Sequence, residues 1–257
     1  MQIYSYDKTF EGFLTLVFEA YETKCFPQRI VDFRSVQNSI FAPSFRVHTQ
    51  EEKAKRVYNS LKARLHKNSF NMIYHVFLSE IDNCEMLLLQ YIRLVFDSKE
   101  RIEADFRNET VLQLLKNERK IVREALRIQM FIRFQKTIDD LYFAPFDPQY
   151  NVLPLVIPHF KDRFSDQKWI IYDTRRNYGF YYNLKDCTEM TLDSQGVDLS
   201  SGKVKNELLA KEEMELQRLW KSYFDNIAIK ERCNLKLHVQ FLPKRFWKYL
   251  PEKHRTN

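Results

Sequence analysis

The chain has 257 residues, of which 44% are hydrophobic and 15% aromatic, so it can form one large domain or two packed domains with a sizeable core. Its four glycines are scattered, and neither a dinucleotide-binding fingerprint nor a phosphate-binding loop is present, which argues against the common nucleotide-binding enzymes. The net charge of +7 is compatible with nucleic acid or another anionic partner.

The first half of the chain is expected to be helical. The first helix follows Asp7 or Thr9, and a capping box from Thr49 to Glu52 predicts the start of another that runs to about residue 65. Two more apolar, helix-periodic segments cover residues 68–78 and 84–96. Asn108 begins a helical pattern that continues to residue 136, as one long helix or two nearly continuous ones, so residues 1–137 are predicted to form a helical region.

The second half has a different pattern, from which we predict an α+β region over residues 138–257. The segment 140–149 has strand-like aromatics with Pro145 and Pro148, which suits an edge strand or the end of a strand, and a short helix follows over 151–164. The segment 168–183 is typical of a β-hairpin whose turn holds Asn177 and Gly179, and residues 187–193 extend it with a third strand. A long helix over 207–227 and a basic, aromatic tail complete the chain.

These elements together predict an α+β fold. A mainly helical N-terminal region packs on a smaller region that contains an antiparallel hairpin or sheet and a long C-terminal helix.

The cysteines and the apolar segments set limits on cofactors and location. Four cysteines stand far apart in the sequence, without zinc or iron–sulfur spacing, so we expect no metal site and no cofactor. The first ten residues do not resemble a signal peptide, and no apolar run is long enough to span a membrane. We therefore expect a cytoplasmic protein with reduced thiols and no membrane partner.

A stripe of arginines occupies one side of the long helix. Arg119, Arg123 and Arg127 recur at every fourth residue, roughly opposite an apolar stripe that begins at Ile121. Like charges at this spacing repel one another, and Glu124 alone is poorly placed to neutralise them. Two interpretations follow: a solvated or internally paired face, or a ridge that follows phosphates, with Arg133 nearby and Phe134 stacking on a base.

Two further segments concentrate positive charge. The tail "LPKRFWKYLPEKHR" holds Lys244 and Arg245 beside Trp247, and the hairpin turn adds Arg175 and Arg176. The three cationic segments form one surface only if the fold brings them together, and aromatic residues between prolines also commonly attach a terminus to a core.

Two weak catalytic patterns are present. Asp147 with Asp166 and Lys168 loosely resembles the metal site of restriction-like nucleases, where two acids hold Mg²⁺ and the lysine assists the attacking water. His159, four residues before Arg163 on the short helix, is placed to face a phosphate, although a lone histidine is more often a structural residue.

Four segments together resemble a known bacterial family: "YDKTFEGFLTLVFEAYE", "REALRIQMFIRFQK", "NVLPLVIPHFKDRFSDQKWIIYDTRRNYGFYY" and "LPKRFWKYLPE". The family is described as "probable DNA metabolism protein", a domain of unknown function. The resemblance implies a neighbouring radical S-adenosylmethionine (SAM) protein of DNA repair or modification, and in some bacteria the domain is fused to a uracil-DNA glycosylase-like domain. No catalytic residues are established for the family, so the resemblance assigns none to this chain.

From the residues and the resemblance we expect a DNA-binding or adaptor protein without catalytic activity of its own, which acts in DNA repair or modification with a radical SAM partner. The expected nucleic-acid-binding residues are Arg119, Arg123, Arg127, Arg133, Phe134, Arg175, Arg176, Lys244, Arg245 and Trp247. Two alternatives remain: a metal-dependent, nuclease-like enzyme, and a protein-interaction module that does not bind nucleic acid.

Overall fold

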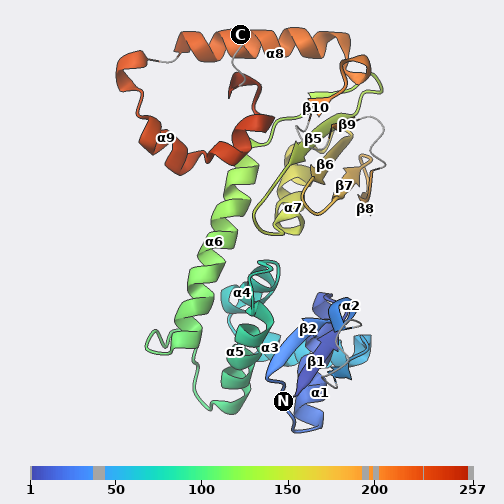
Figure 1. Ribbon diagram of the computed structural model, residues 1–257, viewed down its shortest axis with the longest axis vertical. Coiled ribbons are helices and arrows are strands. Elements are labelled where there is room, and N and C mark those ends of the chain that lie inside the picture. Colours follow the sequence, from blue (N-terminus) through green and yellow to red (C-terminus); the bar gives the residue numbers. More distant parts are fainter. Residues whose placement is uncertain (1, 37–43, 193–196, 199–202, 228, 254–257) are drawn as a thin grey trace. The chain divides into compact units, whose positions relative to one another are not determined.

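The computed structural model describes residues 2–36, 44–192, 197–198, 203–227 and 229–253. Internal contacts divide the chain into two compact units, Met1–Val122 and Arg123–Asn257. Both units combine helices with short strands, so the predicted α+β class is confirmed (Figure 1). The long helix α6 (Glu109–Phe131) contains the boundary between the units, and the side chain of Asn108 caps its start, as predicted, by accepting the Thr110 N–H at 2.9 Å.

The first unit contains a parallel sheet that the sequence did not predict. The central strand β1 (Ile3–Tyr6) pairs on one side with β2 (Arg29–Asp32) and on the other with β3 (Ser44–Arg46). The prediction of a helical region over residues 1–137 is therefore wrong for these three segments, and also for Gln135–Lys136, which form a strand after α6 ends at Phe131. Each strand of the parallel sheet has only three or four residues, which is too short to show a period-two pattern, and its hydrogen-bond partners are distant in the sequence.

Five helices belong to this unit. Two lie between the strands in the sequence, α1 (Phe10–Glu22) and α2 (Phe33–Val36), and three follow β3: α3 (Glu51–Arg64), α4 (Lys67–Phe77) and α5 (Cys84–Asp97). The start of α1 agrees with its predicted cap, because the Thr9 hydroxyl accepts the Gly12 N–H at 3.0 Å. The predicted capping box of α3 is wrong. Gln50 precedes that helix without a side-chain cap, and the Thr49 hydroxyl instead donates to Asp7 at 2.7 Å.

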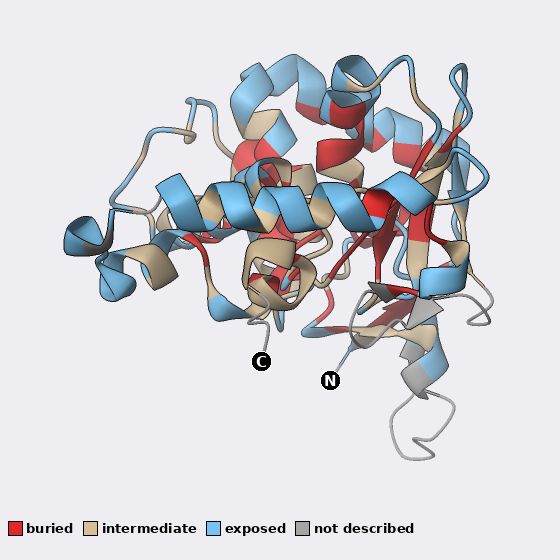
Figure 2. Cartoon of the chain, turned by 90° about the horizontal axis from the view of Figure 1, so that it is seen from above, coloured by how far each residue is buried: buried red, intermediate tan, exposed pale blue. Residues whose placement is uncertain are grey.

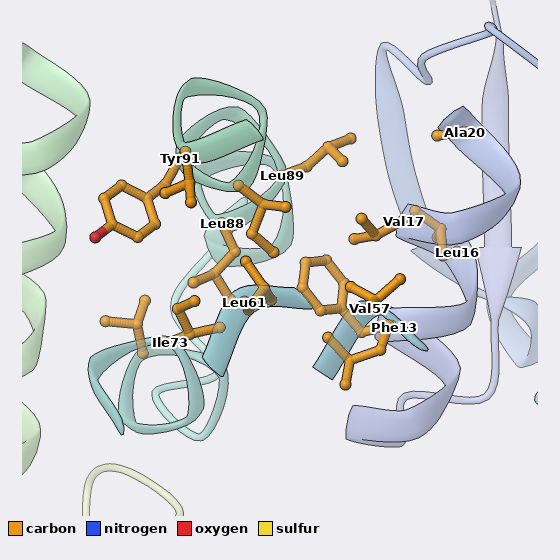
Figure 3. Packing of buried hydrophobic residues seen from close by; sticks show 14 of the residues in the cluster. Phe13, Leu16, Val17, Ala20, Val57, Leu61, Ile73, Leu88, Leu89 and Tyr91 are labelled. Atoms are coloured by element: carbon orange, nitrogen blue, oxygen red, sulfur yellow. The ribbon is translucent and has the colours of Figure 1, made fainter. Parts of the chain in front are cut away.

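The core of the first unit lies where these helices meet. The cluster includes Phe13 and Leu16 of α1, Leu61 of α3, Ile73 of α4 and Leu88 of α5, and none of the five is more than 1% exposed (Figure 3). Burial of each such side chain contributes about 1.5–3 kcal/mol. Apolar residues at helical spacing on each helix thus explain why these segments fold together.

The second unit is built on a mixed five-stranded sheet in the order β4-β5-β6-β7-β8. The strands are β4 (Gln135–Lys136), β5 (Tyr142–Phe146), β6 (Trp169–Asp173), β7 (Tyr178–Tyr182) and β8 (Cys187–Met190). The predicted hairpin is confirmed as β6 and β7, and the predicted third strand as β8. The sheet is not wholly antiparallel, however, because β5 runs parallel to β6 and α7 (Leu153–Arg163) connects them (Figure 1).

The remaining elements of the second unit follow the sheet in the sequence. The short strands β9 (Val197–Asp198) and β10 (Lys203–Val204) pair with each other, and the predicted long helix is α8 (Lys211–Ile227). The helix α9 (Leu235–Phe241) and short 3-10 helices follow, among them η3 (Lys244–Tyr249), which lies against β5. In the described residues, no helix has both the length and the apolar character needed to cross a membrane.

Candidate nucleic-acid interface

The arginines of α6 differ in their surroundings. Arg119 and Arg123 are exposed, whereas the side chain of Arg127 is only 19% exposed and donates to the Gln240 carbonyl at 3.0 Å. Glu124, between them in the sequence, is almost fully buried at 1% exposure. It lies three residues after Ile121 and four before Ile128, so the helix places its carboxylate on the apolar face rather than among the exposed arginines.

The Glu124 carboxylate joins three segments of the second unit. One oxygen accepts the Gln149 N–H at 2.9 Å, from the connection between β5 and α7. The other pairs with the Arg245 guanidinium of η3 and lies 3.8 Å from the guanidinium of Arg127. The helix, the loop and the tail are therefore held by a single buried acid.

The hairpin turn is tied to the same loop. The Arg176 guanidinium pairs with Asp173 at 2.9 Å and donates to the Pro148 and Gln149 carbonyls at 3.3 Å each. Arg175 is exposed and donates to the Gln149 carbonyl at 3.4 Å. Gln149 thus accepts hydrogen bonds from the hairpin through its carbonyl and donates one to Glu124 through its N–H.

These contacts bring together the three cationic segments that the sequence left separate. We call the set the cationic surface; it comprises Arg123, Arg127, Arg175, Arg176, Lys244, Arg245 and Lys248. The three carboxylates that pair within it, Glu124, Asp147 and Asp173, are fewer than its seven cations. Positive charge therefore remains in excess.

The excess positive charge affects the pKa of Arg127. Burial lowers the pKa of this guanidinium; Glu124 opposes the shift, but repulsion from Arg245 and Arg123 adds to it. An anion beside these three arginines would relieve the repulsion.

The carboxyl ends of β5 and β6 complete the surface. Lys248 pairs with Asp147 at 3.2 Å, and the hydroxyls of Thr174 and Tyr249 lie 3.1 Å apart. Burial raises the pKa of the fully enclosed Asp173 carboxyl, although the Arg176 guanidinium opposes this effect. The carboxyl ends of neighbouring parallel strands commonly carry ligand-binding groups in sheets that contain α crossovers.

Three other predicted residues act in packing. The Arg133 guanidinium pairs with Glu252 at 2.9 Å and lies over the Trp220 ring. The Phe134 ring makes edge contacts with Phe160 and Phe164, with centroids 6.0 and 5.3 Å away. These contacts favour a structural role for Arg133 and Phe134 over contact with a base.

Trp247 also anchors the tail. Its indole N–H donates to the Leu242 carbonyl at 3.1 Å, and its ring lies edge-on to His238 and beneath the Lys253 ammonium.

The three residues of the nuclease-like pattern, Asp147, Asp166 and Lys168, do not lie close together. In the parallel pairing, Tyr142 lies opposite Trp169, and Phe146 lies opposite Asp173. Asp147 therefore follows the carboxyl end of the strand pair, while Asp166 and Lys168 precede its amino end, and Lys168 lies roughly 20 Å from Asp147 along the strands. Metal ions bridged by two acids need them within a few ångströms, so this candidate metal site is wrong. Across the described ranges, no group of three or more His, Cys, Asp or Glu residues could hold a metal ion.

His159 is exposed on α7, and its ring makes an edge contact with Phe160 at 5.2 Å. Among the described residues, no hydrogen bond or ion pair joins the His159 ring to a catalytic partner.

A separate polar cluster lies at the carboxyl end of β1 in the first unit. The Glu85 carboxylate accepts from the Tyr6 hydroxyl at 3.1 Å and pairs with Lys8, whose φ of 62° is left-handed. Burial alone would raise the pKa of Glu85, but the Lys8 ammonium together with hydrogen bonds from the backbone and Cys84 holds the pKa below its usual range. The pKa of Asp7 is likewise lowered, because hydrogen bonds from Thr9 and Thr49 outweigh its partial burial. These groups satisfy one another, so the cluster fixes the start of α1.

Three residues that hold the cationic surface together, Glu124, Gln149 and Asp173, were not predicted in these roles. For Glu124 a signal was present, since a carboxylate on the apolar face of a helix needs a buried partner. For Asp173 and Gln149 no local pattern indicated their roles, because each contacts residues across a turn or far away in the sequence.

The fold and this surface together describe the class of protein. It is an α+β protein whose second unit has a cationic surface at the carboxyl ends of two parallel strands. The chain belongs to the family described as a domain of unknown function, DUF4130, whose model matches residues 82–252. No curated protein matches the chain.

Among solved structures, the chain is similar to a pGpG-specific phosphodiesterase, PggH, from Vibrio cholerae, with 8% sequence identity and a TM-score of 0.37. That alignment covers 88% of this chain and 97% of the other. At this TM-score the similarity indicates neither a shared fold nor a shared activity.

Proposed function

We propose that the protein binds DNA through the cationic surface and acts as an adaptor in DNA repair or modification. The observation that supports this most is the convergence of α6, the hairpin turn and the tail on Glu124 and Gln149, which gathers seven cations around three carboxylates. Clusters of arginine and lysine in excess over acids are the electrostatic basis of phosphate binding.

Within the surface, the residues divide into two groups. Four cations pair internally and hold the segments in place: Arg127, Arg176, Arg245 and Lys248. Arg123, Arg175 and Lys244 are exposed beside them and present their charges to the phosphates. Arg119, one turn before Arg123 on the same helix, is also exposed and is a further candidate contact.

The adaptor role rests on the family resemblance. It implies a separate radical SAM protein as the partner that carries out the chemistry, while this chain supplies contact to DNA. Co-expression of the chain with a radical SAM protein of the kind that the resemblance implies, followed by affinity purification of one component, tests this part of the proposal. Recovery of only the tagged component would contradict it.

The DNA-binding part is tested by fluorescence anisotropy of labelled single- and double-stranded DNA at low salt. A triple variant, Arg123→Gln, Arg175→Gln and Lys244→Gln, removes exposed charges without breaking the ion pairs of the scaffold. The matched control changes Lys161, Lys168 and Lys185 to Gln. All three control residues are exposed in the same unit, and Lys168 and Lys185 lie at the opposite end of the β6–β7 pair.

We expect the first variant to lose at least tenfold in affinity and the control to stay within about threefold of wild type. Equal losses in the two variants would mean that binding follows total charge only and would contradict a defined surface. Absence of binding in wild type at low salt would favour the protein-interaction alternative.

A further inference from the structure

A large apolar surface on α8 and α9 has no role in the proposed DNA contact. Leu216, Leu219, Tyr223 and Ile227 recur at helical spacing along α8, and each is more than 55% exposed. Leu235 and Phe241 of α9 are 66% and 63% exposed. In Figure 2, which looks onto α8, this helix is exposed along most of its length.

The extent of this surface matches that of a protein interface. Ten large apolar side chains between residues 214 and 241 are at least 40% exposed. At about 100 Å² each, they present on the order of 1,000 Å², and a standard interface needs roughly 800 Å² from each partner. Apolar patches of this size on soluble proteins usually mark interaction sites.

The carboxyl end of α8 forms one wall of a groove. The groove has a volume of about 700 Å³ and lies between α8 and α9, with Phe224, Ile227 and Phe241 among its walls. Arg232 and Lys253 are the charged residues in its lining, which contains no Asp or Glu in the described part of the chain. The groove therefore suits an apolar segment that carries negative charge.

The amino half of α8 has that chemistry. Glu212 and Glu215 are exposed, and Leu216 and Leu219 follow them on the same helix. One surface thus carries an acidic, apolar segment at one end and a cationic, apolar groove at the other. Such a surface is complementary to itself when two copies meet about a two-fold axis, because each end then meets the opposite end of the other copy.

We propose that the α8–α9 surface is the interface of a homodimer, in which the amino half of α8 of each copy occupies the groove of the other. The two α8 helices run antiparallel, with Leu219 near the two-fold axis and Glu212 and Glu215 facing Arg232 and Lys236 of the second copy. Lys236 is exposed on α9 next to the groove residues Leu235 and Leu237.

Sedimentation velocity over a concentration series, with the full chain, tests this proposal. We expect wild type to approach twice the 31.2 kDa mass of one chain as concentration rises. Leu219→Glu places charge at the centre of the interface and should weaken association at least about a hundredfold. The control Leu184→Glu changes a residue that is 43% exposed on the turn after β7, and should leave association unchanged.

A charge exchange provides an independent test that does not depend on the folding of the Leu219 variant. The acidic pair is changed to Lys (Glu212→Lys, Glu215→Lys) and the basic pair to Glu (Arg232→Glu, Lys236→Glu). Each double variant should associate about tenfold more weakly, and the variant that carries all four changes should recover most of the loss.

Three results would overturn the proposal: a monomer at every concentration, a wild-type dimer that persists in Leu219→Glu, or no recovery in the fourfold variant. A monomer that co-purifies with the radical SAM protein would instead assign the surface to that partner. None of the exchanged residues belongs to the cationic surface, so failure here is distinguishable from failure of DNA binding.

Discussion

Replacement of Glu124 by Gln separates the scaffold of the cationic surface from its contact groups. The change removes one buried negative charge and keeps an oxygen that can still accept the Gln149 N–H. Arg127 and Arg245 then lose the acid that they share. The repulsion of Arg127 by Arg123 and Arg245, which is already present, is no longer offset by Glu124. We therefore expect the second unit to lose stability while the surface becomes more positive.

The magnitude follows from the burial of the three side chains. Removal of one partner from a buried ion pair costs about 3–5 kcal/mol. The Glu124 side chain is 2% exposed, but Arg127 and Arg245 are 19% and 34% exposed, so water screens the two cations that remain. We expect a loss of roughly 2–3 kcal/mol in the free energy of unfolding.

Tryptophan fluorescence isolates this effect. All three tryptophans, Trp169, Trp220 and Trp247, lie in the second unit, so their emission during urea unfolding reports that unit. Glu189→Gln is the matched control, because Glu189 is exposed on β8. A double-mutant cycle with Arg245→Gln should show a coupling energy of about 1 kcal/mol or more.

Two results would refute this reasoning. One is a loss below about 0.5 kcal/mol in Glu124→Gln, the range of ordinary surface changes. The other is weaker DNA binding by a folded Glu124→Gln protein, since the change removes negative charge from a surface that we propose binds phosphates.

Further predictions concern the first unit and the thiols. Because the folded pKa of Asp7 lies below its unfolded value, its stabilising contribution is present above about pH 4 and is lost as pH falls through the folded pKa. Asp7→Asn should cost about 1 kcal/mol at pH 7 and much less near pH 3, as measured by hydrogen exchange of α1 amides; an equal cost at both pH values would contradict this. Gly12→Ala should destabilise the same helix, because a Cβ there would lie 2.8 Å from the Thr49 hydroxyl and closer still to the Asp7 carboxylate; unchanged exchange would contradict it. Burial raises the pKa of the Cys84 thiol to about 12, so Ellman's reagent at pH 8 should label exposed Cys233 quickly and Cys84 only on unfolding.

Local sequence signals accounted for the helices and the hairpin. The starts of α1 and α6 follow from capping side chains, and the β6–β7 turn follows from Asn177, whose φ of 57° is left-handed. The sheet of the first unit could not be predicted in this way. Its strands are short, and parallel pairing depends on residues from three separate segments.

The candidate site shows the same division between local and distant information. The sequence identified most of the cations, but their arrangement depends on Glu124 and Gln149, which connect residues more than twenty positions apart. The proposed metal site failed for a related reason. Asp147 and Lys168 flank a parallel crossover, and such a connection returns the chain to the opposite end of the sheet.

The central claim, that the exposed cations of the second unit contact DNA phosphates, is tested most directly by the salt dependence of binding. For duplex DNA, the slope of the logarithm of the binding constant against the logarithm of salt concentration changes by about 0.9 for each phosphate contact. The variant Arg123→Gln, Arg175→Gln, Lys244→Gln should therefore have a slope shallower than wild type by roughly three units, and the lysine control variant should keep the wild-type slope. A triple variant with an unchanged slope would contradict the account.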